Sequence, residues 1–233
     1  ANNARDKAAV HVVIVGLSGR SKSRLLYQQV DGRWHSKQVS NIRPYLVEGG
    51  NIAVVAKSKP MTNGIPSLIR GNGPTDGGHL LLDRTERDAL LRVEPQAACW
   101  VKRILGSDEF LNSQDRWCLW LVGITEAELQ LMPHVYNRVQ KVAEMRRKST
   151  KLSTQKKSKT PHLFDEIRQP ASGDYILIPR VSSERRAYIP IGFFSSDIIS
   201  SDRNFILPNG TLYEFAILTS IMHNDWMRLV AMR

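Results

Sequence analysis

Apolar and polar positions follow one another along this chain in patterns that predict short strands and amphipathic helices, separated by turn-rich stretches. Apolar runs predict strands over residues 8–17, 52–57, 79–83, 116–123, 174–180 and 187–194, and the first of them is rich in β-branched residues. The Asp31-Gly32 pair predicts the turn of a β-hairpin formed by residues 25–30 and 34–39. Three prolines and five glycines over residues 58–78 predict a long loop.

Helix start signals occur between the predicted strands. A capping box pairs a Thr with an acid three residues later, and the chain has one weakened and two clear examples. They are Thr85 with Asp88, Thr125 with Glu128, and Thr211 with Glu214. Pro95 predicts the start of a helix that runs to Leu105 and ends at Gly106, and Pro133 predicts a helix to about Lys148.

The helix that begins after Thr211 carries an apolar stripe at helical spacing and is therefore expected in the core. Its stripe consists of Leu212, Phe215, Leu218, Met222, Trp226 and Leu229. By contrast, the Lys-, Ser- and Thr-rich residues 148–160 have no periodicity and predict a loop up to Pro161. Together the strands and helices predict an α+β protein with a mixed sheet and flanking helices.

Positive charge is concentrated in one segment of the chain, whose formal net charge is +11. Between Arg138 and Lys159, nine Lys or Arg residues and the single acid Glu144 give a net charge of +8. Such a localised field is typical of proteins that bind a polyanion with regularly spaced charges, so nucleic acid is the first hypothesis. The alternative is a charged face that is only solvated.

Signatures of an independent catalytic site are missing from the sequence, which has no Walker loop and no GxGxxG, GxSxG or HExxH motif. Neither Cys99 nor Cys118 has a second Cys or His at metal-ligand spacing, so both are expected to be buried thiols rather than zinc ligands. Neither a membrane-spanning apolar run nor a signal-peptide layout is present, which favours a cytoplasmic protein. The patterns at both ends, with no initiating Met, predict a piece of a longer protein.

The best candidates for reading DNA bases lie between two predicted strand ends. Arg can bridge two acceptors on a guanine edge, Glu can accept from a cytosine amine, and Ser can reach a base or a phosphate. The candidates are Arg180, Ser182, Ser183, Glu184, Arg185 and Arg186. The alternative is that Glu184 and Arg186 pair within the protein and the serines cap a turn.

Backbone contacts are expected from the basic segment, because flexible Lys side chains are point charges without planar complementarity to a base. The phosphate candidates are Arg138, Lys141, Arg147, Lys148, Lys151, Lys156, Lys157 and Lys159. The glycine-containing stretch at Arg70, Asn72 and Gly73 can also approach DNA closely, although it is equally interpretable as a long turn.

Seven motifs in the same order resemble one known family. They are AAVHVVIVG, NIRPYLVEGGN, GNGPTDGGHLLL, GSDEFLNSQDRWCLWL, PHLFDEI, IPRVSSERRAYIPIGF and YEFAILTSIMHNDWMR. The sequence is similar to the C-terminal part of the MmeI-type, or type IIL, restriction-modification proteins, and the resemblance spans nearly the whole chain.

This resemblance implies a DNA-recognition piece of a larger bacterial polypeptide. Residues 1–40 would be the last strands and hairpin of an adenine-N6 methyltransferase domain, 41–195 the target-recognition domain, and 196–233 the start of a C-terminal helical region. The partners implied are double-stranded DNA and the methyltransferase domain of the same polypeptide, with no membrane. S-adenosylmethionine, and Mg²⁺ for any endonuclease, would bind elsewhere in the parent protein, because this sequence contains no counterpart of the family's catalytic, cofactor-binding or nuclease motifs.

Two other functions remain open at this point. One is a stand-alone RNA-binding or structural module, against which the scarcity of aromatics within the basic run argues. The other is a small metal-dependent nuclease, against which the missing catalytic motifs argue.

Overall fold

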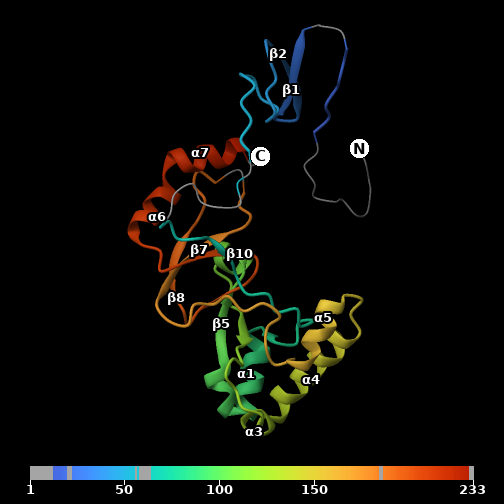
Figure 1. The fold of residues 1–233 in the computed structure, drawn as a ribbon, viewed down its shortest axis with the longest axis vertical. Helices are drawn as coiled ribbons and strands as arrows, with labels where there is room; N and C mark the ends of the chain where they lie inside the picture. Colours follow the sequence, from blue (N-terminus) through green and yellow to red (C-terminus); the bar gives the residue numbers. More distant parts are fainter. Residues whose placement is uncertain (1–12, 20–22, 56, 58–63, 184–185, 231–233) are drawn as a thin grey trace. The chain divides into compact units, whose positions relative to one another are not determined.

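The computed structural model describes residues 13–19, 23–55, 57, 64–183 and 186–230. The described chain separates into two compact units, one through residue 55 and one from residue 57 onward. Helices and strands are both present, and the strands form antiparallel and mixed sheets, so the predicted α+β class is confirmed (Figure 1).

The first unit contains the predicted hairpin, whose strands are β1 (Arg24–Val30) and β2 (Arg33–Val39). Asp31 and Gly32 form its turn with φ angles of 49° and 77°, the left-handed values that a tight hairpin turn requires. This part of the prediction is confirmed.

Two other strands predicted near this unit are not seen. Residues 13–17 and 52–55 are described but carry no strand, while residues 8–12 and 56 lie outside the described part of the chain. An apolar run becomes a strand only when a neighbouring strand satisfies its backbone N–H and C=O groups. Neither described stretch belongs to a sheet, and both are exposed.

The second unit holds two four-stranded sheets. One has the order β3-β10-β7-β8 and is antiparallel throughout, and the other has the order β4-β6-β5-β9 with β5 and β9 parallel, which makes it mixed. Its strands are β3 (Ile69–Arg70), β4 (Leu81–Leu82), β5 (Val101–Leu105), β6 (Trp117–Leu119), β7 (Asp174–Pro179), β8 (Gly192–Ser195), β9 (Ile199–Ser200) and β10 (Asn204–Pro208). Because only residues 201–203 separate β9 from β10, one short turn supplies a strand to each sheet.

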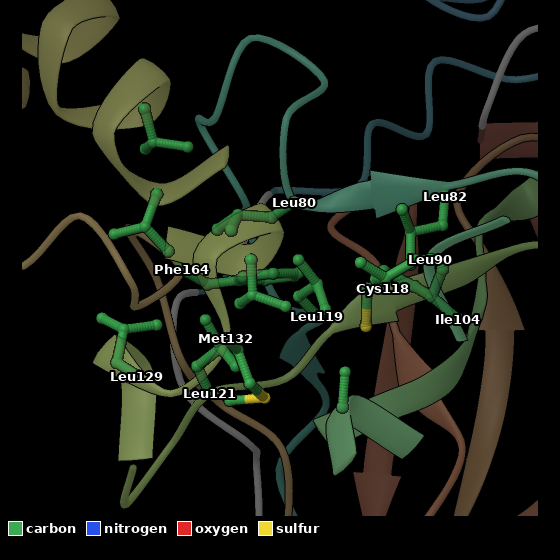
Figure 2. Packing of buried hydrophobic residues seen from close by; sticks show 14 of the residues in the cluster. Leu80, Leu82, Leu90, Ile104, Cys118, Leu119, Leu121, Leu129, Met132 and Phe164 are labelled. Carbon is green, nitrogen blue, oxygen red and sulfur yellow. The ribbon is translucent and has the colours of Figure 1, made fainter. Parts of the chain in front are cut away.

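The helices of this unit are α1 (Arg84–Val93), α2 (Ser107–Leu111), α3 (Glu126–Gln130), α4 (Pro133–Arg147), α5 (Leu152–Lys156), α6 (Leu212–Thr219) and α7 (Ile221–Val230), with 3₁₀ turns η1 (Pro95–Trp100) and η2 (Lys157–Lys159). The main core lies between α4 and the mixed sheet, and Figure 2 shows its packing around Leu119, Leu121 and Met132. Val135, Val139 and Val142 of α4 enter this core at the predicted spacing and are at most 1% exposed. Burying each such side chain stabilises the fold by roughly 1.5–3 kcal/mol.

Helix starts differ from the prediction where a better cap lies nearby. The N-cap of α1 is Asp83 rather than Thr85, because its carboxylate accepts from the Glu86 amide at 2.8 Å and Glu86 completes the box. At α4, the carboxylate of Glu94 accepts from the amides of His134 and Val135. No local pattern predicts that cap, because Glu94 precedes the helix by about 40 residues.

The helix predicted over residues 95–105 is wrong in its second half. Pro95 starts only the 3₁₀ turn η1, after which β5 pairs with β6 on one side and β9 on the other. Pairing on both edges outweighs the helical spacing of the apolar residues. The loop predicted over residues 148–160 is also wrong, since α5 and η2 lie there.

The predicted C-terminal core helix is broken and largely exposed. Ser220, with ψ of 150°, separates α6 from α7. Leu212 and Met222 of the predicted stripe are 75% and 79% exposed, although Phe215 stacks on Phe193 with ring centroids 5.2 Å apart. The apolar stripe is therefore a correct pattern but a wrong indicator of burial within this chain.

The two cysteines also differ from each other. Cys118 is buried as predicted, and burial raises the pKa of its thiol well above the ordinary value. Cys99 is exposed, which corrects the prediction for that residue. Among the described helices, none is both long and apolar enough to cross a bilayer.

Candidate nucleic-acid interface

Two of the predicted DNA-contacting arginines, Arg70 and Arg180, hydrogen-bond to the same residue, Asp202. Arg70, at the end of β3, donates to the carboxylate of Asp202 at 3.1 Å and to its carbonyl at 3.4 Å. Arg180, just after β7, donates to the same carbonyl at 3.1 Å, and its guanidinium lies 5.7 Å from the Phe205 ring centroid. Asp202 therefore brings together two arginines that are far apart in the sequence.

The turn that carries Asp202 borders a cleft of about 620 Å³. Three arginines line it, namely Arg116, Arg180 and Arg203, together with acids of α2 and of the turn. Glu109 accepts from Arg116 at 3.2 Å and from the Gly106 amide at 2.9 Å, which fixes one wall. Hydrogen bonds hold Arg116 and Arg180 in this lining, and a guanidinium suits planar acceptors such as base edges and phosphates.

Sequence reasoning did not find Arg116, Asp202 or Arg203 as members of this site. Arg70 and Asp202 are 132 residues apart, and no spacing motif links them. Only the strand order, which places β3 next to β10, creates this arrangement.

The end of the loop after Arg180, from Arg186 to Ile189, is hydrogen-bonded to α7. The backbone amide of Arg186 donates to the Ser183 carbonyl at 3.1 Å. Arg228 of α7 donates to the carbonyls of Arg186 and Ala187, and Asn224 accepts from the Ile189 amide at 2.8 Å. Ser182 and Ser183 lie in this loop, whereas Glu184 and Arg185 lie outside the described residues, so their predicted pairing or base contact stays a prediction.

Asn72 lies inside the protein rather than at its surface, and its side chain is fully buried. Its oxygen accepts from the amides of Arg168 and Gln169 at 2.6 and 2.8 Å. Its NH₂ donates to the Ser200 carbonyl at 2.8 Å and to the Gln169 side chain at 2.9 Å. Both polar atoms of the amide are thus used within the protein, and the predicted closeness of this stretch to DNA stays a prediction.

The glycines beside Asn72 allow backbone segments to approach closely. A Cβ at Gly71 would lie 2.1 Å from the Ser201 carbonyl oxygen, so only glycine fits there. Gly73 exchanges backbone hydrogen bonds with Glu166 at 3.0 and 3.1 Å. The stretch is consequently a packed junction that leads into turns and bends at residues 76–80, and its closeness to DNA stays a prediction.

Seven of the eight predicted phosphate contacts are exposed, and they lie in or beside α4, α5 and η2. The helices α4 and α5 lie next to each other (Figure 1). The exposed members are Lys141, Arg147, Lys148, Lys151, Lys156, Lys157 and Lys159.

Arg138, the remaining predicted phosphate contact, differs from the others. It is partly buried, and it donates to the His79 carbonyl at 3.1 Å and to Glu86 at 2.7 Å. These bonds anchor α4 to β4 and α1, so the guanidinium is already engaged within the fold.

Two acids offset part of the positive charge at this surface. A hydrogen bond from Lys148, 2.6 Å away, lowers the pKa of Glu144. Glu166 has a lowered pKa mainly because Arg168 donates to it, and the same bond raises the pKa of Arg168. Both acids are ionised at neutral pH, so Lys148 and Arg168 contribute less to the field than the formal charge suggests.

No group of three or more His, Cys, Asp and Glu side chains in the described ranges is placed to hold a metal ion.

Comparisons with known proteins agree with the predicted resemblance, which is confirmed. A family model described as the target recognition domain of MmeI matches residues 48–233. DNA methyltransferase A of Bacillus subtilis (strain 168) is 38% identical over 233 residues, which are 100% of this chain and 26% of that protein. The solved structure of the type IIL restriction-modification enzyme MmeI in complex with DNA gives a TM-score of 0.85 at 38% identity, covering 90% of this chain and 28% of that one. The chain thus spans about a quarter of the length of each relative. On this match, the chain belongs to the MmeI target-recognition-domain family.

Proposed function

We propose that the second unit recognises a specific sequence in double-stranded DNA on behalf of an adenine-N6 DNA methyltransferase. The observation that carries the proposal is the cleft beside Asp202, lined by Arg116, Arg180 and Arg203, in the same unit as the exposed basic residues of α4, α5 and η2. Family membership supports the same function, since the matching model describes a target recognition domain.

The basic residues of α4, α5 and η2 and the loop after Arg180 would have different roles in DNA binding. The lysines of α4, α5 and η2 hold phosphates, which gives affinity and register without sequence choice. Side chains of the loop from Arg180 to Arg186 read base edges in the major groove, because Arg, Ser and Glu there offer directional donors and acceptors. The glycine junction at residues 70–73 brings the Arg70 end of β3 close to the DNA without itself reading a base.

The methyltransferase chemistry would belong to the longer polypeptide. In this proposal residues 1–40 complete the methyltransferase domain, residues 41–195 recognise the target, and residues 196–233 begin a helical region. S-adenosylmethionine supplies the methyl group when bound, but no described residue here is assigned to it. What this chain contributes is to hold the site in register while the target adenine is turned out of the stack. We place this function in the bacterial cytoplasm, where the DNA is.

The direct test is equilibrium binding of the full-length protein to duplexes over a salt series. One duplex carries the motif that is methylated in the host genome, and the other has the same composition in scrambled order. We expect tighter binding to the motif at every salt concentration, by about 10³-fold or more, and a steep loss of affinity with salt for both duplexes.

Three experimental results would contradict this proposed function. Equal affinity for the two duplexes at all salt concentrations would refute sequence recognition. Stronger binding to single-stranded RNA than to duplex DNA would instead favour the RNA-binding alternative. Metal-dependent cleavage by residues 1–233 alone would favour the nuclease alternative.

A further inference from the structure

Arg146 is the exception within the basic segment. It lies in α4 directly before the exposed Arg147, yet its own side chain is fully buried. All five N–H groups of its guanidinium are accounted for by main-chain carbonyl oxygens. A charge placed in this way cannot contact a phosphate, so its role must be exerted through the segments that it holds.

These carbonyls come from two stretches that are separate in the sequence. Nε donates to Thr75 at 3.0 Å and one terminal nitrogen donates to Pro74 at 2.9 Å, both in the glycine-rich stretch. The terminal nitrogens also donate to Lys157, Thr160 and Leu163 at 3.1, 3.2 and 2.8 Å. One side chain therefore ties the stretch that follows Arg70 to the stretch that carries the predicted phosphate-binding lysines.

Burial of a guanidinium is unfavourable unless its donors and its charge are compensated. Burial lowers the pKa of Arg146, while the nearby carboxylates of Asp165 and Asp76 act in the opposite direction. The carbonyls of Lys157 and Thr160 lie at the C-terminal end of η2, and they also accept from the backbone amides of Thr160 and Leu163, respectively. Arg146 therefore adds a second hydrogen bond to each carbonyl and fixes the backbone of residues 157–160, which carries Lys157 and Lys159.

Further hydrogen bonds join the two stretches that Arg146 connects. The Thr75 hydroxyl bonds to the Asp165 carboxylate at 3.2 Å, and Lys157 donates to the Asp165 carbonyl at 3.0 Å. Backbone bonds between Gly73 and Glu166 complete the connection. Lys157 is thus fixed twice, because its carbonyl accepts from Arg146 and its ammonium donates to Asp165.

We propose that Arg146 is a positioning residue for DNA binding, which couples the glycine-rich stretch after Arg70 (residues 71–76) to the lysines of residues 156–159. The proposal rests on the DNA-binding function proposed above. A structural core residue would affect binding only by lowering the amount of folded protein, whereas a positioning residue acts through the lysines and shares their effect.

The test uses R146K in the full-length protein, with R92K as the matched control. Lysine keeps the charge but has one nitrogen, which cannot reach carbonyls on both sides as the planar guanidinium does. Arg92 is exposed in the last turn of α1 and is not among the predicted DNA contacts, so R92K should leave every measurement unchanged. Hydrogen exchange of peptides covering residues 71–79 and 157–166 should become faster in R146K in both peptides together, with the β7–β10 pairing unaffected.

Binding is measured in a double-mutant cycle with K156A/K157A/K159A. R146K should weaken binding to motif and scrambled duplexes alike, on the order of tenfold, and flatten the salt dependence. In the combined variant the reduction in affinity should be close to that of the lysine variant alone, because both changes act on the same phosphates.

Additive reductions in affinity, or loosening of one peptide without the other, would overturn the proposal. If R146K does not fold, T75V gives the same test more mildly, because it removes only the Thr75–Asp165 bond and should loosen the same two peptides. Absence of DNA binding by the unchanged protein would refute the proposed function and the positioning role with it. The exchange measurement would still decide separately whether Arg146 couples the two stretches.

Discussion

Asn72 connects three backbone segments through one buried amide, and its removal should be costly. In N72A the amides of Arg168 and Gln169 and the carbonyl of Ser200 lose a partner inside the protein. Buried groups left without a hydrogen bond cost about 1–3 kcal/mol each, partly recovered by relaxation, so we expect the free energy of unfolding to fall by about 2–4 kcal/mol. Urea unfolding followed by circular dichroism measures it.

N137A is the matched control for this substitution, since Asn137 is exposed on α4. It should change the free energy of unfolding by less than about 0.5 kcal/mol. Equal stability of N72A and N137A would show that the amide network contributes nothing to the fold.

At this same scale, sequence reasoning identified residue types well and environments poorly. The exposed lysines of the basic segment were predicted from charge alone. Nothing local distinguishes Arg146 from Arg147, although one is buried among carbonyls and the other is exposed. The difference arises from the 3.6-residue period of α4, which turns Arg146 to the side of Val139 and Val142, and from the distant carbonyls that meet it there.

Two of the three capping boxes predicted from the sequence, at Thr125 and Thr211, are present in the structure. The box at Thr211 predicts how the stability of α6 depends on pH. Hydrogen bonds from Thr211 lower the pKa of Glu214 below its ordinary value of 4.5. A lowered folded-state pKa means that the capping box stabilises α6 above the unfolded-state pKa. That contribution disappears as pH falls through the folded-state pKa. In T211A the pKa of Glu214 should therefore rise toward 4.5.

A second box provides the control, because Thr125 lowers the pKa of Glu128 in the same way at the start of α3. NMR titration of the two carboxyl groups should show that T211A moves only Glu214 and that T125A moves only Glu128. A shift of neither group would mean that the hydroxyls do not hold these carboxylates in solution.

Elements whose partners are distant in the sequence were predicted poorly. Residues 101–105 have helical spacing, but β6 and β9 take them as a strand, and β9 lies about 95 residues away in the chain. The apolar stripe of α6 and α7 fits a core helix equally well, yet much of it is exposed. Local patterns determine which face of an element is apolar, whereas the neighbour that covers that face is set by topology.

At the scale of the whole molecule, the concentration of charge predicts how affinity should depend on salt. Each neutralised phosphate contributes about 0.9 to the slope of log K against log salt concentration, because its counterion is released. K156A/K157A/K159A should therefore weaken binding to all duplexes and flatten the slope by up to about one unit for each lysine that binds a phosphate. K102A, on β5 and paired with Asp197, should leave the slope unchanged. An unchanged slope in the triple variant would mean that these lysines are only solvated.

A substitution in the loop after β7 should behave in the opposite way if that loop reads bases. R186A is expected to cost roughly 1–3 kcal/mol on the correct motif and to relax the choice at one base pair, with little effect on scrambled DNA. Competition binding against duplexes substituted singly at each position of the motif measures this. The salt slope should stay nearly constant, because a base contact releases few counterions. Equal weakening on motif and scrambled duplexes would instead assign Arg186 to the DNA backbone, and the reading of sequence would then fall to the arginines that meet at Asp202.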